Sequence, residues 1–271
     1  MVKALIITGF GINCQEEMVA AYELAGASAE QIHLQQLLLG NVSIHDYDIL
    51  NLAGGFSFGD DLGAGKVLAN KIQSQRLPSG KTLLQEITTF IAEGKHVLGI
   101  CNGFQVLVRL GLLPNTQLDG QQEVSLMTND STRFEARWVH CIVPPKHNSP
   151  FLKGITQIEL PVRHAEGKLV IAKAEIQAQI IKDKLNVMSY SSSEGSSTNK
   201  YPENPNGAML NCAALTDITG QILGMMPHPE AFLSLYNHPN WRPLLRQNPD
   251  RSKVGEGLQI FKNIVDYLSD K

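Results

Sequence analysis

The sequence predicts an α/β fold in which a mostly parallel central sheet has helices on both faces and additional antiparallel strands in the second half. Two patterns support this class. Over the first half, short apolar runs alternate with segments of helical spacing, as in a parallel sheet flanked by helices. After Leu113-Pro114 the chain changes to short strand-like pieces, and no long linker separates the halves. We therefore expect a single domain over residues 1–271.

Three apolar runs of the first half are expected to form strands: Ala4–Thr8, Asp48–Ala53 and His96–Ile100. A glycine-containing turn follows each run, and open α/β sheets place their functional sites at such carboxyl ends. Helical spacing predicts helices over Gln15–Ala25, roughly Leu62–Gln75 and Thr82–Ala92. Gly94 is well placed to end the last of these helices.

The second half contains six strand-like pieces, and we expect them to extend the same sheet and cover its edge. They are Arg133–Val143, Ile158–Val162, Lys168–Ala172, Asn186–Ser189, Ala208–Ala213 and Gln221–Met226. The polar stretch 191–199 is interpreted as a surface loop, because strand-like sequence resumes soon after it. Gly255–Leu268 has the apolar face of a final amphipathic helix.

Composition and charge exclude several classes of protein. The chain is 43% hydrophobic and 18% charged, as in ordinary globular proteins rather than disordered ones. A formal net charge of −3 gives no electrostatic reason to expect a nucleic acid or an anionic membrane as a partner. Met1-Val2-Lys3 runs directly into an apolar segment that is too short for a signal peptide or a membrane span. We expect a cytoplasmic protein.

The four cysteines are widely spaced and form no Cys-x-x-Cys pair. Their spacing suggests neither a zinc site nor a disulfide framework, and we expect no metal site. Cys141 lies in an apolar run and Cys212 beside two alanines. Both are expected to be buried, unreactive thiols.

Cys101 has the surroundings of a nucleophile. Gly99 and Gly103 stand two residues before and two residues after it, between an apolar strand and a helix-like segment. This is the layout of a nucleophile elbow. So sharp a turn brings backbone segments together and leaves no space for side chains at the flanking positions. The amino terminus of the following helix would stabilise the thiolate.

A thiol nucleophile needs a general base and a group that orients the base. The segment Met225–Glu230 follows an apolar strand and supplies both. His228 would pair with Cys101, and Glu230 would accept a hydrogen bond from the other imidazole nitrogen. Alone, the segment would be interpreted as a turn with a solvated histidine and glutamate. Combined with the elbow, it predicts a triad.

Acyl transfer also requires hydrogen-bond donors for a tetrahedral oxyanion. Gly54-Gly55 stands at the end of another predicted strand, where free N–H groups can face the elbow. We expect the N–H groups of Gly55 and Asn102 to form the oxyanion hole. A glycine pair at a strand end is by itself more often a simple turn.

Together these segments resemble the class I (triad) glutamine amidotransferases, and within them the glutaminase components of phosphoribosylformylglycinamidine synthases. Cys101-Asn102-Gly103-Phe104-Gln105 is the most discriminating match. The matching segments cover nearly the whole chain: Gly11–Cys14, Gly54–Asp60, Gly99–Gln105, Arg133–Arg137, His164–Gly167, Tyr201–Gly207 and Met225–Glu230. The resemblance implies a flavodoxin-like class I glutamine amidotransferase fold.

The resemblance also implies a reaction. The Cys101 thiolate attacks the side-chain amide of L-glutamine, His228 protonates the departing ammonia, and Glu230 orients His228. A thioester forms and is hydrolysed to glutamate. The residues that the resemblance assigns to glutamine binding are Gln105, Arg133, Phe134, His164 and Glu166. For His164 a purely structural role stays open, and Cys14 is assigned to packing.

Further implications concern partners. Related synthases pass the ammonia to a separate ATP-dependent subunit of de novo purine (IMP) biosynthesis, and a small accessory subunit is a further candidate partner. The chain has no Gly-x-x-x-x-Gly-Lys-Ser/Thr phosphate loop, so we expect no cofactor in this chain and place ATP and Mg²⁺ on the synthetase partner. Phe58 and Ala231 depart from the residues of many relatives, which affects the expected docking surface rather than hydrolysis.

Two alternatives remain open from the sequence. Other thiol hydrolases on a similar scaffold, such as peptidases or deglycases, share the cysteine elbow, but typically take their base from elsewhere than a His-x-Glu segment like 228–230. A catalytically silent regulatory subunit would keep the fold and lose the triad, whereas this chain has all three residues.

Overall fold

The computed structural model describes residues 1–270, and Lys271, the end of the expected domain, lies outside them. Its strands are β1 (Lys3–Thr8), β2 (Ser28–His33), β3 (Ile49–Leu52), β4 (His96–Ile100), β5 (Ser125–Thr128), β6 (Glu135–Ile142), β7 (Gln157–His164), β8 (Glu166–Val170), β9 (Asn186–Ser191), β10 (Cys212–Thr216) and β11 (Ile222–Met225).

The α-helices are α1 (Gln15–Leu24), α2 (Leu34–Leu38), α3 (Lys66–Ser74), α4 (Leu83–Ala92), α5 (Asn102–Arg109), α6 (Ala174–Lys182), α7 (Trp241–Gln247) and α8 (Leu258–Ser269). Short 3-10 turns are η1 (Ile44–Asp46), η2 (Ser57–Asp60), η3 (Pro150–Leu152), η4 (Met209–Asn211), η5 (Pro229–Ala231) and η6 (Leu235–Asn237).

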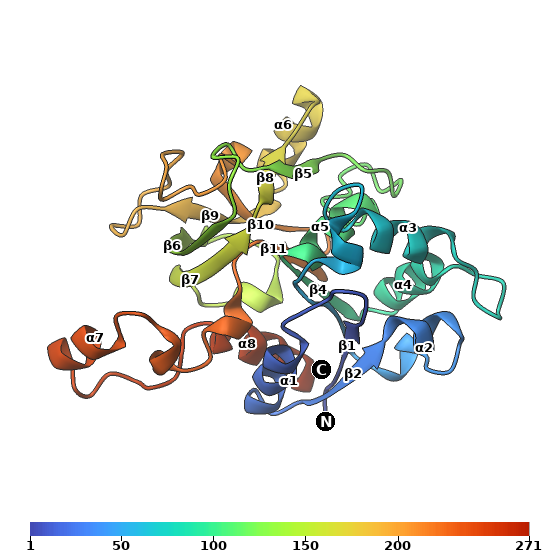
Figure 1. The fold of residues 1–271 in the computed structure, drawn as a ribbon, viewed down its shortest axis with the longest axis horizontal. Coiled ribbons are helices and arrows are strands. Elements are labelled where there is room, and N and C mark those ends of the chain that lie inside the picture. The colour runs from blue at the N-terminus through green and yellow to red at the C-terminus, as the bar shows by residue number, and fades with distance from the viewer. Residues whose placement is uncertain (271) are drawn as a thin grey trace.

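One nine-stranded sheet, in the order β2-β1-β3-β4-β11-β10-β9-β6-β7, runs through the molecule (Figure 1). Neighbouring strands from β2 to β11 are parallel. From β11 to β7 each strand pairs antiparallel with the next. A second, two-stranded sheet pairs β5 with β8. The expected α/β class, with a parallel sheet extended by antiparallel strands, is confirmed.

Helices cover both faces of the parallel part. The crossover from β1 to β2 through α1 and the crossover from β3 to β4 through α3 and α4 move along the sheet in opposite directions. Because such crossovers are right-handed, opposite directions place their helices on opposite faces. In agreement, α1 packs against α8, whereas α3 packs against α4 and α5.

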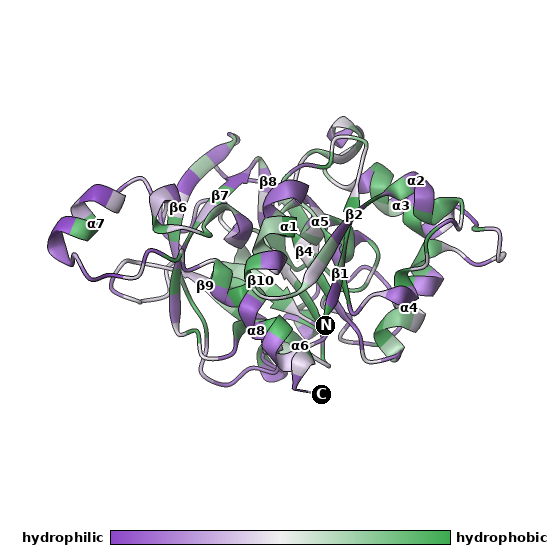
Figure 2. Cartoon of the chain, turned by 90° about the horizontal axis from the view of Figure 1, so that it is seen from below, coloured by the Kyte–Doolittle hydropathy of each residue, from purple (hydrophilic) through white to green (hydrophobic). Residues whose placement is uncertain are grey.

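The core lies along the parallel strands. Every residue of β3, β4 and β11 is buried, as expected for strands that are covered on both faces. Figure 2 shows that α2, α3 and α4 each carry both apolar (green) and polar (purple) residues. Among residues 1–270, no helix has the length and apolar character needed to cross a membrane.

Two expected boundaries are wrong by four residues. The helix expected from about Leu62 begins at Lys66, because Leu62, Gly63 and Gly65 have positive φ, which a right-handed helix cannot contain. The strand expected over Ala208–Ala213 begins only at Cys212, after η4.

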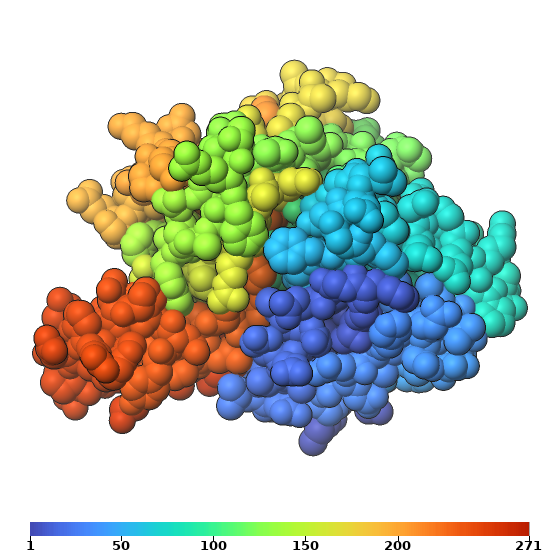
Figure 3. Space-filling model, in the orientation of Figure 1, coloured from blue at the N-terminus to red at the C-terminus, as the bar shows by residue number. Residues whose placement is uncertain are grey.

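Five elements were not expected: β2, α2, β5, α6 and α7. β2 is an edge strand with no fully buried residue, so its sequence has no apolar run. α6 buries only Ile176 and Ile180. α7 has no buried residue and projects, with the segment around it, from the body of the molecule (orange-red in Figure 3).

Candidate active site

Four neighbouring parallel strands, β1, β3, β4 and β11, bring their carboxyl ends to one edge of the sheet. The segments after them carry Cys14, Gly55, Cys101 and His228, in that order. A backbone hydrogen bond joins the end of β4 to the end of β11: the Cys101 N–H donates to the Met225 carbonyl at 2.7 Å. The sheet order therefore brings together residues that lie far apart in the sequence.

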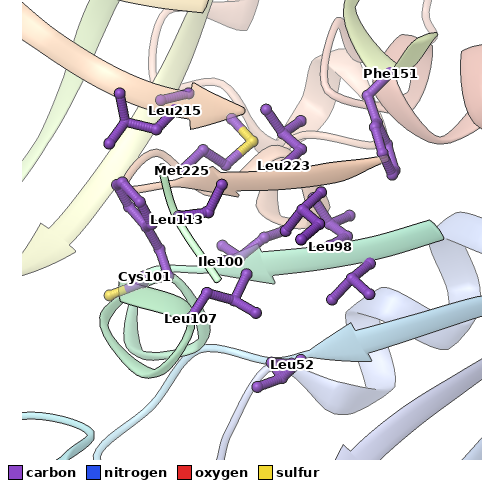
Figure 4. Packing of buried hydrophobic residues seen from close by; sticks show 14 of the residues in the cluster. Leu52, Leu98, Ile100, Cys101, Leu107, Leu113, Phe151, Leu215, Leu223 and Met225 are labelled. Carbon is purple, nitrogen blue, oxygen red and sulfur yellow. The ribbon is translucent and has the colours of Figure 1, made fainter. Parts of the chain in front are cut away.

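Cys101 stands where β4 meets α5, with φ 52° and ψ −104°, a conformation that L-residues rarely adopt. A Cβ atom on Gly103 would lie 2.0 Å from the carbonyl oxygen of Leu52, and one on Gly99 would lie 2.8 Å from the Gly103 backbone. The expected steric need for both glycines is confirmed. Figure 4 shows the sulfur of Cys101 at the edge of the apolar cluster, on the turn after β4.

His228 and Glu230 lie on the turn after β11 and are buried, with exposed fractions of 2% and 1%. Nδ1 of His228 is 2.5 Å from Oε1 of Glu230. Burial alone lowers the pKa of His228, but the negative charges of Glu230 and of the Cys101 thiolate outweigh burial and hold this pKa well above its ordinary value. The arrangement favours a protonated imidazole on His228.

Gly54 faces both His228 and Cys101. A Cβ atom there would lie 2.9 Å from Cε1 of His228 and 3.6 Å from Cβ of Cys101. Sγ of Cys101 lies 3.6 Å from the carbonyl oxygen of Arg163. Cys101 is only 5% exposed, so little of its side chain faces solvent.

Two N–H groups are suited to an oxyanion. Gly55 has φ 119°, and a Cβ atom there would lie 2.5 Å from the backbone nitrogen of Asn13, so glycine is required. No hydrogen bond from the Gly55 N–H to another of residues 1–270 is formed. Asn102 is the first residue of α5, where an N–H has no partner within the helix. Both groups remain predicted oxyanion donors.

Asn102 and Gln105 connect α5 to two loops. Nδ2 of Asn102 donates to Oε1 of Gln105 at 2.9 Å and to Oδ1 of Asp60 at 3.3 Å. Nε2 of Gln105 donates to the Glu166 carbonyl oxygen at 2.5 Å. The Glu166 carboxylate accepts from the Ala64 N–H at 3.2 Å. Gln105 and Glu166, both predicted to bind substrate, therefore belong to one network.

His164 is buried and held by Asn129. Its Nδ1 lies 3.2 Å from Oδ1 of Asn129, whose Nδ2 donates to the His164 carbonyl oxygen at 2.8 Å. Burial lowers the pKa of His164 to about 3, with a further contribution from the charge of His228. The ring is therefore neutral at physiological pH. Its buried Nε2 has no hydrogen-bond partner among the described residues, so the substrate-binding and structural interpretations both stay open.

Arg133 and Phe134 lie on the exposed surface. The Phe134 ring is 6.1 Å from the ring of Phe56, which directly follows Gly55. Both rings are 49% exposed. The structure thus places Phe134 beside the glycine loop, whereas the exposed side chain of Arg133 stays outside the buried network around Cys101.

Three residues of this region were not singled out as functional from the sequence. Asp60 bonds to Asn102, Asn129 holds His164, and Cys14 lies beside His228. Asp60 and Cys14 belong to segments that carried the resemblance, which was the one available signal. Asn129 lies in no such segment, and only the fold connects it to the site.

Comparison with known proteins points in one direction. Residues 1–268 match the family model of the CobB/CobQ-like glutamine amidotransferase domain. The chain is 39% identical over 279 residues to the phosphoribosylformylglycinamidine synthase subunit PurQ of Methanococcus maripaludis strain C5, with 98% of each chain covered. It is 40% identical over 267 residues to the PurQ subunit of Dehalococcoides mccartyi, covering 98% of this chain and 97% of the relative.

Solved structures agree with this comparison. A chain of the PurLQS structure from Thermotoga maritima superposes with a TM-score of 0.70 at 25% identity, covering 98% of this chain and 99% of that one. A glutamine amidotransferase from Thermotoga maritima gives a TM-score of 0.55 at 13% identity, over 100% and 99% of the two chains. The second likeness concerns the fold alone.

Proposed function

The chain belongs to the CobB/CobQ-like glutamine amidotransferase domain family, and we propose that Cys101, His228 and Glu230 are its catalytic triad. It is a glutamine amidotransferase, the glutaminase subunit of phosphoribosylformylglycinamidine synthase in purine biosynthesis. The strained turn at Cys101, beside a buried His228–Glu230 contact of 2.5 Å, is the observation that carries the triad.

In the first half of the reaction, the Cys101 thiolate attacks the side-chain amide carbon of glutamine. The carbonyl oxygen becomes an oxyanion, and the N–H groups of Gly55 and Asn102 stabilise it. His228 then gives its proton to the departing amide nitrogen, the C–N bond breaks, and ammonia leaves. The products of this half-reaction are ammonia and a thioester between glutamate and Cys101.

In the second half, water attacks the thioester. His228, now neutral, takes a proton from the water, and the same two N–H groups hold the second oxyanion. The C–S bond breaks to give glutamate and the Cys101 thiolate, while His228 is again protonated. Glu230 keeps the imidazole oriented throughout, because its 2.5 Å contact fixes Nδ1 and leaves Nε2 for the chemistry.

We assign substrate selection to the hydrogen-bond network of Asn102, Gln105 and Glu166 near the Cys101 thiol. Gln105 donates to the Glu166 carbonyl oxygen, and the Glu166 carboxylate accepts from the Ala64 N–H. We propose that Gln105 and Glu166 hold the amino-acid end of glutamine. His164, with its unpartnered Nε2, is a proposed neutral donor or acceptor in the same pocket. Arg133 and Phe134 are proposed to line its rim.

The partner is the ATP-dependent synthetase subunit, in keeping with the PurLQS structure. We propose that ATP and Mg²⁺ bind on that partner and that a small accessory subunit completes the complex. A cytoplasmic location is proposed because the four cysteines are unpaired, which is typical of a reducing compartment.

Peptidase-like chemistry is the main alternative reaction. A thiol that is 5% exposed and contacts the Arg163 carbonyl suits a small amide better than a polypeptide. Hydrolysis of peptides or glycated substrates without glutaminase activity would favour this alternative. A catalytically silent subunit would be favoured if a glutamine-like diazo-ketone failed to alkylate Cys101 selectively.

The triad is tested in the complex with the synthetase. Cys101→Ala should lower glutamate formation from glutamine by about 10⁴-fold or more, because no other nucleophile replaces the thiol. Ammonia-dependent synthesis by the partner should continue unchanged. Cys212→Ala is the matched control, since Cys212 is a buried cysteine on β10 and should keep its glutaminase activity. Persistent glutamine-dependent turnover by the Cys101 variant would remove this residue from the mechanism.

A further inference from the structure

The side-chain amide of Asn129 is held in one orientation by three backbone groups. Its Nδ2 donates to the carbonyl oxygens of Arg133 and His164, at 3.0 and 2.8 Å. Its Oδ1 accepts from the Gly167 N–H at 3.0 Å. Turning the amide over would set its oxygen against two carbonyl oxygens and its NH₂ group against an N–H. Oδ1 of Asn129 is therefore a hydrogen-bond acceptor.

This orientation decides which nitrogen of His164 carries the hydrogen. Nδ1 of His164 lies 3.2 Å from Oδ1 of Asn129, and two acceptors at that distance repel each other unless Nδ1 is an N–H. Burial lowers the pKa of His164 to about 3, so the ring is neutral and has a single N–H. Nε2 is therefore a bare nitrogen, which can accept a hydrogen bond but cannot donate one.

No donor from the protein reaches this nitrogen. His164 is 2% exposed, and its Nε2 has no hydrogen-bond partner among residues 1–270. Gly167 packs closely on the ring, since a Cβ atom there would lie 2.7 Å from Nδ1 and from Cε1. A buried acceptor without a donor is unfavourable. A ligand that brings an N–H to Nε2 therefore gains binding free energy.

His164 ends β7, which runs past the reacting groups. The carbonyl oxygen of the preceding residue, Arg163, lies 3.6 Å from Sγ of Cys101. The Pro161 carbonyl accepts from the His228 N–H at 2.8 Å. Burial, and after it the charge of His228, lowers the pKa of His164, so the two histidines are electrostatic neighbours. β7 thus carries His164 to the thiol and the base.

Glutamine and glutamate differ in what their side chains offer to a bare nitrogen. The NH₂ group of glutamine donates hydrogen bonds, whereas the carboxylate of glutamate only accepts them. A bare Nε2 attracts the first group and repels the second. The same nitrogen can therefore favour binding of the substrate and release of the product.

We propose that His164, oriented by Asn129, recognises the side-chain NH₂ group of glutamine and rejects glutamate. Nε2 accepts one N–H of the amide and holds the nitrogen that will leave as ammonia, while His228 delivers the proton. Asn129 is a positioning residue, because it acts through the His164 ring. The inference rests on the proposed glutaminase function and gives His164 a single role in it, that of an acceptor.

The hydrogen on His164 is located first, without any assay of activity. Long-range proton–nitrogen correlation spectra of the full chain, with isotope-labelled histidine, distinguish the two neutral forms of each ring. The signals that disappear in His164→Asn identify this residue. They should show the hydrogen on Nδ1 at neutral pH, and a hydrogen on Nε2 would overturn the inference.

Two variants separate the roles of the two ring nitrogens. In His164→Asn the amide nitrogen can replace Nδ1 and keep the contact with Asn129, but no group replaces Nε2. In His164→Gln the longer side chain brings an acceptor oxygen near the former position of Nε2. His140→Asn, a change of another histidine on β6, is the matched control. Circular dichroism checks that all three variants fold.

Ligand preference is measured by calorimetry in the complex with the synthetase, on a Cys101→Ala background that leaves bound glutamine intact. The ratio of the glutamate and glutamine dissociation constants should fall about tenfold in His164→Asn, which lacks the acceptor. It should fall less in His164→Gln and stay constant in His140→Asn. Equal weakening of both ligands in His164→Asn would overturn the inference.

A second substrate separates recognition of the NH₂ group from a structural role. The γ-methyl ester of glutamate shares the amino-acid end of glutamine, but its leaving group has no N–H. His164→Asn should lower kcat/KM for glutamine about tenfold more than for the ester. Equal losses with the two substrates would overturn the inference and leave the triad intact. Hydrolysis of neither substrate by the unaltered complex, with the glutamine preference retained, would instead overturn the proposed function alone.

Discussion

Two buried histidines near Cys101 have pKa shifts of opposite sign, and the difference comes from their partners. His228 lies against the charged Glu230 and Cys101, which outweigh burial and raise its pKa. His164 lies against the uncharged Asn129 and near the charge of His228, so burial lowers its pKa to about 3. One ring is therefore suited to carry a proton at neutral pH and the other is not.

The charge of Glu230 should set the alkaline limit of activity. Glu230→Gln removes this charge, so the pKa of His228 should fall and the imidazolium needed for ammonia release should be lost at lower pH. The alkaline limb of kcat/KM should move to lower pH, and kcat should fall by about 10²–10⁴-fold. The measurement is a pH profile of the complex. Glu175→Gln, an exposed change on α6, is the control, and an unmoved alkaline limb would contradict the role of Glu230.

His164 should make the fold sensitive to acid. Its pKa is about 3 in the folded chain and about 6.5 when unfolded, so between these values only the unfolded state takes up the proton. The free energy of unfolding should therefore fall as the pH drops from about 6.5. Urea unfolding at several pH values should show a shallower fall for His164→Gln. Parallel curves for the two proteins would show that His164 is not held neutral by the fold. His228 contributes with the opposite sign: its stabilisation is present at low pH and is lost as the pH rises through its raised pKa.

At the scale of elements, the junction of β4 and α5 depends on close backbone approach. Gly103 touches the end of β3, and Gly224 on β11 gives space to the ring of Phe104, since a Cβ atom there would lie 2.2 Å from that ring. α5 therefore sits directly on the strands, and its first N–H groups and the Cys101 thiol keep fixed positions relative to β3 and β11.

Gly103→Ala tests this packing. Alanine is the better helix former, but its Cβ would lie 2.0 Å from the Leu52 carbonyl oxygen, so α5 must move away from β3. The free energy of unfolding should drop by about 3 kcal/mol, and most glutaminase activity should be lost. Chemical denaturation measures the free energy of unfolding, and glutamate release measures the glutaminase activity.

The matched control is Gly120→Ala. Gly120 has φ 67° and open space around its Cβ position, so only backbone strain of about 1 kcal/mol is expected, with normal activity. Equal losses in the two variants would contradict close approach to Leu52 as the constraint at Gly103, which has no positive φ of its own.

For the whole molecule, the sheet order argues for one cooperative unit. β11 comes from near the end of the chain, yet it lies between β4 of the first half and β10 of the second. Neither half can complete its sheet without β11. We therefore propose that residues 1–271 fold as a single domain.

Denaturant unfolding measures this cooperativity. In Trp241→Phe the remaining tryptophan, Trp138, is on β6 in the antiparallel part and contacts Phe232. Far-UV circular dichroism follows the helices, most of which belong to the first half. The fluorescence and dichroism transitions should share one midpoint. Two separated midpoints would show that the parallel and antiparallel parts unfold independently.

Local sequence determined the fold class and the elbow, and it predicted the partners of the proposed triad. Apolar runs and glycine spacing are properties of short segments, so β3, β4 and β11 and the glycines around Cys101 could be identified one segment at a time. His228 and Glu230 were identifiable because they are two residues apart and meet within one turn.

Tertiary structure decided which segments meet. The contact of Asn129 with His164, the edge strand β2 and the exposed helix α7 left no periodic signal in the sequence. Cys14 was expected only to pack, yet the adjacency of four strand ends brings its thiol to His228 and Glu230. Spacing along a chain describes neighbours within one element, whereas the order of strands in a sheet depends on long-range pairing that such spacing does not encode.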